Sequence, residues 1–142
     1  MTTIAYKDGI IATDGRITQN SIITNEDAEK RIEVGGCVFW LSGAVFDWKI
    51  LAEAYVNGDG MEDQELKVSG LVLDGDGLHF ISWDGGIYTE KVNLDRPRAA
   101  GSGTQFAMGA MMAGASAEEA VEAAKTLDVY SGGTVRAYKL WD

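Results

Sequence analysis

The chain begins Met1-Thr2-Thr3-Ile4-Ala5-Tyr6, and after the turn Lys7-Asp8-Gly9 it continues as Ile10-Ile11-Ala12-Thr13. Both apolar runs are rich in β-branched residues and Gly9 suits a backbone with positive φ, so the spacing predicts a buried β-hairpin. If the initiator methionine is removed, Thr2 carries a free α-amine and a β-hydroxyl on one residue. Together these groups supply a nucleophile and its base. The opening stretch therefore predicts a strand whose first residue is chemically reactive.

The size and charge of the chain limit its possible classes. Its 142 residues, 46% of them hydrophobic, suffice for one domain with a buried core, and we expect a single domain over residues 1–142. The net charge of −10 argues against a nucleic-acid partner, because phosphate binding requires a basic patch. No run has the length of a membrane helix and no apolar leader is present, so we expect a cytoplasmic protein with no membrane partner.

Hydrophobic periodicity and turn residues predict the elements of the remaining chain. The acidic segment 58–65 is expected to be a loop. Ser116 and Glu119 form the pattern of a capping box at the start of a helix. The expected strands span residues 2–6, 10–13, 17–24, 32–41 (broken by a turn at Gly35-Gly36), 68–73, 78–83, 87–92 and 134–140, and the expected helices span residues 47–56, 104–113 and 116–127. This order predicts an α+β domain in which helices lie outside two antiparallel sheets.

Three later segments carry polar groups at the ends of predicted elements. Asp14 directly follows an apolar strand, where a carboxylate can orient a cation or accept from a backbone donor. Ala100-Gly101-Ser102-Gly103-Thr104 precedes a helix, so its glycines permit close backbone approach and its amides can face an anion. Asp128 and Ser131 follow the last predicted helix and are near enough in sequence to meet a common partner. Each segment alone also fits an ordinary turn.

In this order, the segments resemble the proteasome β-subunit and HslV family of N-terminal-nucleophile (Ntn) hydrolases. The opening threonine, the hairpin and Asp14-Gly15-Arg16-Ile17-Thr18 are similar to the start of that family, with its Asp-x-Arg-x-Thr segment. Leu41-Ser42-Gly43-Ala44 resembles its small-residue strand end, Gly101-Ser102-Gly103 its Gly-Ser-Gly turn, and residues 128–133 its Asp-x-x-Ser-Gly-Gly turn. The resemblance spans nearly the whole chain. It implies a four-layer αββα sandwich of two antiparallel sheets flanked by helices, reduced in size.

The resemblance also implies a role for individual residues. Thr2 Oγ attacks a peptide carbonyl, its α-amine accepts the proton, and the Gly43 amide stabilises the oxyanion. Asp14 orients a catalytic lysine. The other implied residues are Ser102, Asp128 and Ser131, which support the amine and the attacking water, and Arg16, Thr18 and Ser42, which contact the substrate.

Two placements of the family's lysine are open. Lys30 is the nearest lysine to the expected position. Matching Arg31-Ile32 to the family's usual basic–apolar pair instead places that position at Ala28, and the chain would then have lost the lysine.

The implied function is that of a threonine endopeptidase acting on peptides or unfolded proteins. We expect a homo-oligomer with inward-facing sites, an unidentified unfoldase as a possible partner, and no metal or organic cofactor. Two alternatives are a catalytically inactive assembly subunit of the same fold and an Ntn amidase with a small substrate. Retention of Asp14 together with Asp128 and Ser131 favours the active form, because a purely structural subunit has no need for all of them.

Overall fold

The computed structural model describes residues 2–58 and 65–141, so Met1 and most of the predicted 58–65 loop lie outside the described residues. Within that range the predicted mixture of antiparallel strands and three helices is confirmed. The elements follow the order β1 (Thr3–Lys7), β2 (Ile10–Thr13), β3 (Ile17–Gln19), β4 (Ile22–Asn25), β5 (Arg31–Val34), β6 (Cys37–Gly43), α1 (Val45–Asn57), β7 (Val68–Asp74), β8 (Gly77–Trp83), β9 (Ile87–Lys91), β10 (Arg98–Gly101), α2 (Thr104–Met112), α3 (Ala117–Leu127) and β11 (Arg136–Lys139).

The predicted opening hairpin lies at the centre of a four-stranded sheet with the order β10-β1-β2-β11. The turn between β1 and β2 uses positive φ at Asp8 and Gly9, as the sequence predicts. Strand β10 was not predicted, because Arg98-Ala99-Ala100-Gly101 has no β-branched residue and no local strand signal. Its pairing with β1, which sets Thr3 opposite Gly101, makes it a strand.

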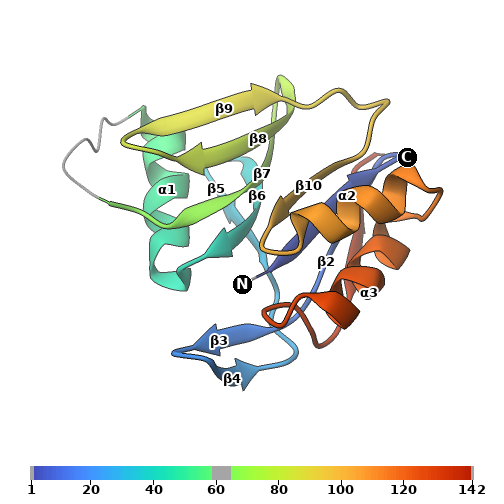
Figure 1. The fold of residues 1–142 in the computed structure, drawn as a ribbon. Helices are drawn as coiled ribbons and strands as arrows, with labels where there is room; N and C mark the ends of the chain where they lie inside the picture. The colour runs from blue at the N-terminus through green and yellow to red at the C-terminus, as the bar shows by residue number, and fades with distance from the viewer. Residues whose placement is uncertain (1, 59–64, 142) are drawn as a thin grey trace.

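The later strands form a five-stranded antiparallel sheet in the order β5-β6-β7-β8-β9. Strands β3 and β4 form a separate two-stranded sheet, where the sequence predicted one continuous β region over residues 17–24. Asn20 and Ser21 adopt φ values of 50° and 68°, which is the geometry of a two-residue hairpin turn. This hairpin projects beside the two larger sheets (Figure 1).

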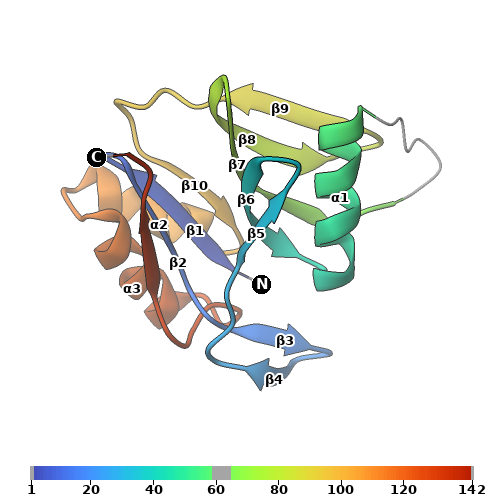
Figure 2. The ribbon, with the colours of Figure 1, turned by 180° about the vertical axis from the view of Figure 1, so that it is seen from behind.

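Three apolar clusters hold the elements together. Trp48 and Leu51 of α1 pack against the five-stranded sheet, so this helix covers one face of the sheet. The second cluster contains Ile4, Tyr6 and Trp40 and joins the two larger sheets. In the third cluster, helices α2 and α3 cover the four-stranded sheet through small side chains, mainly alanines at positions 5, 12, 99, 107, 117 and 120. The helices therefore lie on the outer sides of the facing sheets (Figures 1 and 2).

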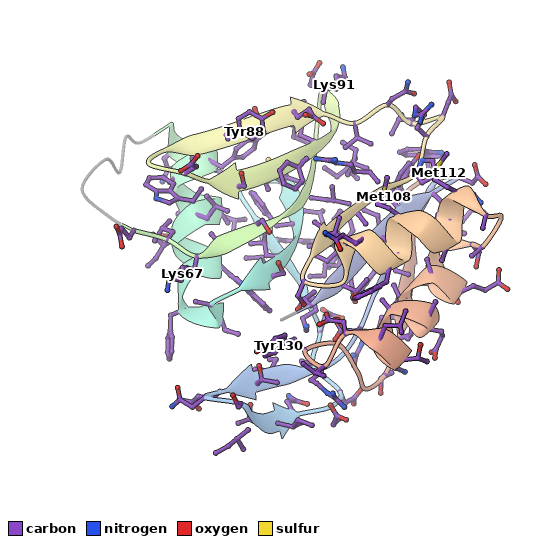
Figure 3. All side chains as sticks on the ribbon, viewed as in Figure 1. Lys67, Tyr88, Lys91, Met108, Met112 and Tyr130 are labelled. Atoms are coloured by element: carbon purple, nitrogen blue, oxygen red, sulfur yellow. The ribbon has the colours of Figure 1, made fainter. Side chains whose placement is uncertain are left out.

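Side chains fill the space between the sheets, whereas the labelled Lys67, Lys91 and Met112 point outward (Figure 3). Helix α3 begins with the predicted capping box, in which Ser116 Oγ accepts from the Glu119 amide and Glu119 accepts from the Ser116 amide. None of the helices among residues 2–58 and 65–141 has the length and hydrophobicity required to cross a membrane. The start of β1 lies where the two larger sheets and the β3–β4 hairpin approach one another (Figure 2).

Candidate active site

Thr2 lies immediately before β1 and is 1% exposed. The turn after β10 approaches its backbone closely, since the Gly103 amide donates to the Thr2 carbonyl at 3.3 Å. Gly101 has a φ of +94°, and a Cβ atom there would lie 2.1 Å from the Thr2 carbonyl oxygen. Position 101 therefore accepts only glycine without displacing Thr2.

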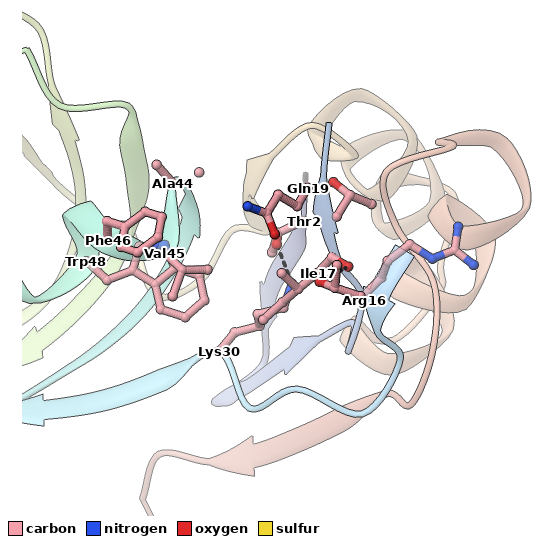
Figure 4. Close-up of a pocket in the computed structure, with 12 residues that line it drawn as sticks. Thr2, Arg16, Ile17, Gln19, Lys30, Ala44, Val45, Phe46 and Trp48 are labelled. Atoms are coloured by element: carbon pink, nitrogen blue, oxygen red, sulfur yellow. Dashed lines mark hydrogen bonds between the residues drawn. The ribbon is translucent and has the colours of Figure 1, made fainter. Parts of the chain in front are cut away.

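A buried ion pair lies beside the Thr2 side chain. Asp14 and Lys30 both have fully buried side chains, and Lys30 Nζ lies 3.2 Å from Asp14 Oδ1. Lys30 Nζ also donates a hydrogen bond to Thr2 Oγ1 (Figure 4). Burial lowers the pKa of Lys30, and the neighbouring Asp14 carboxylate offsets this only in part. An ammonium group held in this way stabilises negative charge that develops on the threonine oxygen.

The Asp14 carboxylate also accepts three backbone hydrogen bonds. The donors are the amides of Thr3 at 3.1 Å, Gly132 at 2.9 Å and Arg16 at 3.3 Å. These bonds satisfy both carboxylate oxygens, which a fully buried charge requires. They also connect the start of β1, the start of the β3 segment and the turn before β11. Asp14 therefore fixes the relative positions of three segments around Thr2.

A second polar group lies on the other side of the Thr2 backbone. The Thr2 nitrogen donates to Ser102 Oγ at 3.1 Å, and Ser102 Oγ donates to Asp128 Oδ2 at 2.6 Å. Ser131 Oγ donates to the same oxygen of Asp128 at 2.7 Å. Burial alone raises the pKa of Asp128, but the bonds from Ser102 and Ser131 outweigh it and the net pKa is lowered. This network connects the ionised Asp128 carboxylate to the Thr2 nitrogen through the Ser102 hydroxyl.

Thr2 and Lys30 open onto a cavity of about 350 Å³. One wall comes from the start of α1, with Val45, Phe46 and Trp48, and the opposite wall comes from the β3–β4 hairpin (Figure 4). Phe46 is 86% exposed, which is unusual for a phenylalanine. The full lining consists of Thr2, Arg16, Ile17, Thr18, Gln19, Thr24, Lys30, Gly43, Ala44, Val45, Phe46 and Trp48. Thr2 thus borders a largely apolar space.

The structure brings most of the residues selected from the sequence together. Thr2, Asp14, Lys30, Ser102, Asp128 and Ser131 form two hydrogen-bonded groups that meet at Thr2. Gly43 lines the same cavity. Of the two placements considered for the lysine, Lys30 is the one whose ammonium reaches Thr2.

The three residues expected to contact substrate differ from one another. Thr18 and Arg16 line the cavity, but the Arg16 guanidinium is bound to Glu26 at 2.7 Å and to the Val129 carbonyl at 3.1 Å. Ser42 does not line the cavity. It is buried and shares a hydrogen bond of 3.3 Å with Ser69 on the neighbouring strand.

Sequence reasoning missed Thr3 and the walls of the cavity. Thr3 Oγ1 lies 2.7 Å from Ser131 Oγ, and its amide binds Asp14, so it connects both polar groups. The adjacent threonines at positions 2 and 3 were the available signal. No local pattern distinguishes Phe46 or Trp48 from core residues. In the described part of the chain, no three His, Cys, Asp or Glu side chains are grouped so that they could hold a metal ion.

Among the comparisons with known proteins, only that with solved structures gives matches, and these concern the fold. No protein-family profile matches the chain, and no curated protein sequence matches it. Among solved structures, eukaryotic HslV from Trypanosoma brucei is 19% identical with a TM-score of 0.72, over 96% of this chain and 97% of that chain. BPH from Thiobacillus denitrificans in complex with epoxomicin is 20% identical with a TM-score of 0.69, over 99% of both chains.

A second structure of the Thiobacillus denitrificans BPH is 20% identical, with a TM-score of 0.66 over 96% of this chain and 95% of that chain. At such low identities, the similarity concerns the fold. The predicted resemblance to HslV is confirmed at that level, and the chain has an HslV-like fold along nearly its whole length.

Proposed function

We propose that this chain is an Ntn hydrolase of the threonine-peptidase class, in which cleavage between Met1 and Thr2 unmasks the nucleophile. One observation carries the proposal. A buried ammonium, paired with Asp14, donates to the Thr2 hydroxyl at the edge of a substrate-sized cavity. A purely structural role is a weak explanation for a fully buried lysine, because desolvating its charge costs free energy that an apolar side chain of similar volume would not cost.

In this mechanism Thr2 Oγ attacks a peptide carbonyl and its free α-amine accepts the hydroxyl proton, directly or through water. An ordinary α-amine has a pKa of about 7.7–8.0, and the nearby Lys30 ammonium lowers it by like-charge repulsion. The amine is then neutral at working pH and can act as a base. Asp14 holds Lys30 in place. The protonated amine then gives this proton to the peptide nitrogen as the C–N bond breaks, so the C-terminal fragment leaves as an amine and the N-terminal fragment stays on Thr2 as an ester. Water hydrolyses the ester, which releases this fragment as a carboxylic acid and regenerates Thr2.

The remaining residues have supporting roles in the proposal. The Gly43 amide faces the oxyanion, and one good donor of this kind lowers the activation barrier by roughly 3–4 kcal/mol. Ser102, Asp128 and Ser131 hold the α-amine and the water through the hydrogen bonds at the Thr2 nitrogen. Thr18 contacts the substrate from the cavity wall, together with Arg16. All steps use groups of the chain itself, so the proposal includes no metal ion or organic cofactor.

The HslV-like fold supports a wider set of proposals about the molecule. We propose that residues 1–142 form a single domain with the four layers αββα. We also propose that the chain forms a homo-oligomer whose sites face inward, and that it is located in the cytoplasm. Peptides or unfolded proteins are the proposed substrates, and any unfoldase partner is unidentified. The apolar cavity wall supports a peptide substrate, since side chains of unfolded proteins can bury there.

Intact mass spectrometry of the purified protein tests the proposal. The expected result is loss of Met1 and a covalent adduct with epoxomicin, the compound present in the BPH structure. Thr2→Ala should reduce peptide cleavage to below about one-thousandth, because the nucleophile is lost. Thr89→Ala, at an exposed position of β9, is the matched control and should leave cleavage unchanged.

Each alternative has its own outcome in this experiment. Cleavage by the Thr2→Ala variant at the parent rate would show that Thr2 is not the nucleophile. Loss of Met1 with neither adduct nor cleavage would favour the inactive assembly subunit. Hydrolysis of small amides without cleavage of peptides would favour the amidase.

A further inference from the structure

The segment that carries Lys30 has no regular structure of its own. Residues 26–30 connect β4 to β5 without a helix or strand, yet Ala28 and Lys30 are buried. The Lys30 carbonyl accepts from the Leu41 amide at 3.1 Å, but a segment outside the strands does not fix a side chain by itself, because its backbone retains many conformations. The position of the ammonium at Thr2 therefore depends on contacts from outside the segment.

Arg136 supplies the most extensive of these contacts. It lies on β11, opposite Thr13 of β2 in the strand register. Its Nη1 donates to the Ala28 carbonyl at 2.8 Å. Its Nη2 donates to the Asp27 carbonyl at 3.2 Å and to the Asp27 carboxylate at 3.0 Å. One guanidinium group thus binds two consecutive carbonyls and a carboxylate, a geometry that a lysine ammonium cannot reproduce.

Backbone bonds attach the same segment to the four-stranded sheet and its turns. The Ala28 amide donates to the Gly15 carbonyl at 2.9 Å, and the Thr134 amide donates to the Glu26 carbonyl at 2.8 Å. Gly15 directly follows Asp14, the partner of Lys30. Arg136 completes this attachment at Asp27 and Ala28, which precede Lys30 by three and two residues. Backbone hydrogen bonds and the Arg136 side chain therefore together join the sheet that carries Thr2 to the segment that carries Lys30.

We propose that Arg136 is a positioning residue for Lys30, which holds the ammonium against Thr2 Oγ. The role of Lys30 in peptide cleavage rests on the proposed function above, whereas the structural link between Arg136 and Lys30 does not. Arg136 is not among the residues that line the cavity, so it acts through the backbone of Asp27 and Ala28.

The charged surroundings of Lys30 determine what loss of Arg136 would change. Asp14 is the carboxylate paired with Lys30, and the α-amine that processing creates on Thr2, whose hydroxyl Lys30 binds, is the other titratable group beside it. Arg16 lines the same cavity but is neutralised by Glu26. If the segment is released, Lys30 regains contact with water and moves away from the amine. The pKa of Lys30 then rises towards its ordinary value, and the pKa of the amine rises as well.

The test compares Arg136→Met with Arg136→Lys and Arg98→Met. Arg98 is a suitable control because it also lies on a strand of the four-stranded sheet, pairs with Glu90, and has a similar side-chain exposure of 31% against 28%. The first measurement is the titration of the Lys30 side-chain NMR signal in lysine-labelled protein, assigned with Lys30→Met. Arg136→Met should raise the pKa of Lys30, and Arg98→Met should not.

The second measurement is the pH profile of peptide cleavage. Arg136→Met should lower kcat by on the order of 100-fold with little change in KM, as expected for a displaced catalytic group. Its acid limb should move to higher pH, because the α-amine then has a higher pKa. Arg136→Lys retains the charge and should recover only part of kcat. If Arg136→Met fails to fold, Arg136→Lys still tests whether Arg136 positions Lys30.

The outcomes separate the two proposals. Unchanged Lys30 titration and an unchanged pH profile in folded Arg136 variants would overturn the positioning role, even if thermal stability falls. A parent protein without any peptidase activity, but with a Lys30 titration that depends on Arg136, would overturn the proposed function and leave the positioning role intact.

Discussion

Asp14 and Asp74 have nearly the same local sequence and very different surroundings. Each follows an apolar strand and precedes a glycine, in Ala12-Thr13-Asp14-Gly15 and in Val72-Leu73-Asp74-Gly75. The Asp14 side chain is fully buried, while that of Asp74 is 18% exposed. Asp74 accepts from the amides of its own turn, at 2.8 Å from Asp76 and 3.1 Å from Gly77. The hydroxyl of Tyr55 and, at 3.5 Å, the ring of His79 complete its partners.

One partner of Asp14 comes from much further along the chain. Its most distant donor, the Gly132 amide, is separated from it by 118 residues, whereas the most distant partner of Asp74, Tyr55, is separated by 19. A turn aspartate with nearby donors stabilises a hairpin that could form alone. A buried aspartate with distant donors forms its bonds only when the whole domain is assembled. The comparison shows that an identical Asp-Gly signal can mark a local turn or a junction of the tertiary structure.

Asp14→Ala and Asp74→Ala test this difference most directly. Asp14→Ala leaves the Lys30 ammonium and three backbone amides buried without a carboxylate, so we expect a loss of about 3–5 kcal/mol in the free energy of unfolding. Asp74→Ala should cost only about 1 kcal/mol, because water reaches its donors. Urea unfolding followed by tryptophan fluorescence measures both. Equal losses for the two variants would contradict the distinction between junction and turn.

Two turn glycines sharpen the same comparison. Gly101 and Gly85 both have positive φ, +94° and +70°, but a Cβ atom would contact Thr2 at the first and nothing within 4 Å at the second. Gly85→Ala should therefore show only the backbone cost of about 1–2 kcal/mol. Gly101→Ala adds a steric clash with the Thr2 carbonyl, for a total of about 2–4 kcal/mol. Thermal unfolding and peptide cleavage should both be more strongly reduced in Gly101→Ala, and a larger defect in Gly85→Ala would refute this explanation.

The smallest expected effect is the acid sensitivity of the Asp74 turn. Burial raises the pKa of Asp74, but the hydrogen bonds from Tyr55 and from the Asp76 and Gly77 amides outweigh it, so the net pKa is lowered. A carboxyl with a lowered folded pKa stabilises the protein above its unfolded pKa of about 3.9, and this stabilisation disappears as the pH falls through the folded pKa.

Asp74→Asn should therefore reduce the unfolding free energy at pH 6 by at most about 1 kcal/mol, and this difference should shrink below pH 4. Asp84→Asn, in the next turn of the same sheet, is the matched control for the change from carboxylate to amide. Urea unfolding at several pH values provides the measurement. A difference that grows on acidification would mean that the sign of the Asp74 effect is wrong.

Local signals in the sequence correctly predicted many elements. The β1–β2 hairpin follows from its β-branched runs and Gly9, and the start of α3 follows from Ser116 and Glu119. Strand β10 could not be predicted, because its four residues become a strand only through pairing with β1. The choice between Lys30 and Ala28 was also open in the sequence, since a two-residue shift in an irregular segment has no local marker.

The sequence by itself determined the order of most elements, the type of fold and the polar residues proposed to act at Thr2, because turn preferences, helix caps and hydrophobic periodicity act over a few neighbouring residues. Only the tertiary structure decided that Lys30 meets Thr2, that Thr3 joins the two polar groups, and that Phe46 and Trp48 face the β3–β4 hairpin across a cavity. These contacts depend on how the sheets pack and on side chains such as Arg136 that bind distant backbone. Their free energy is gained only when the complete domain has formed.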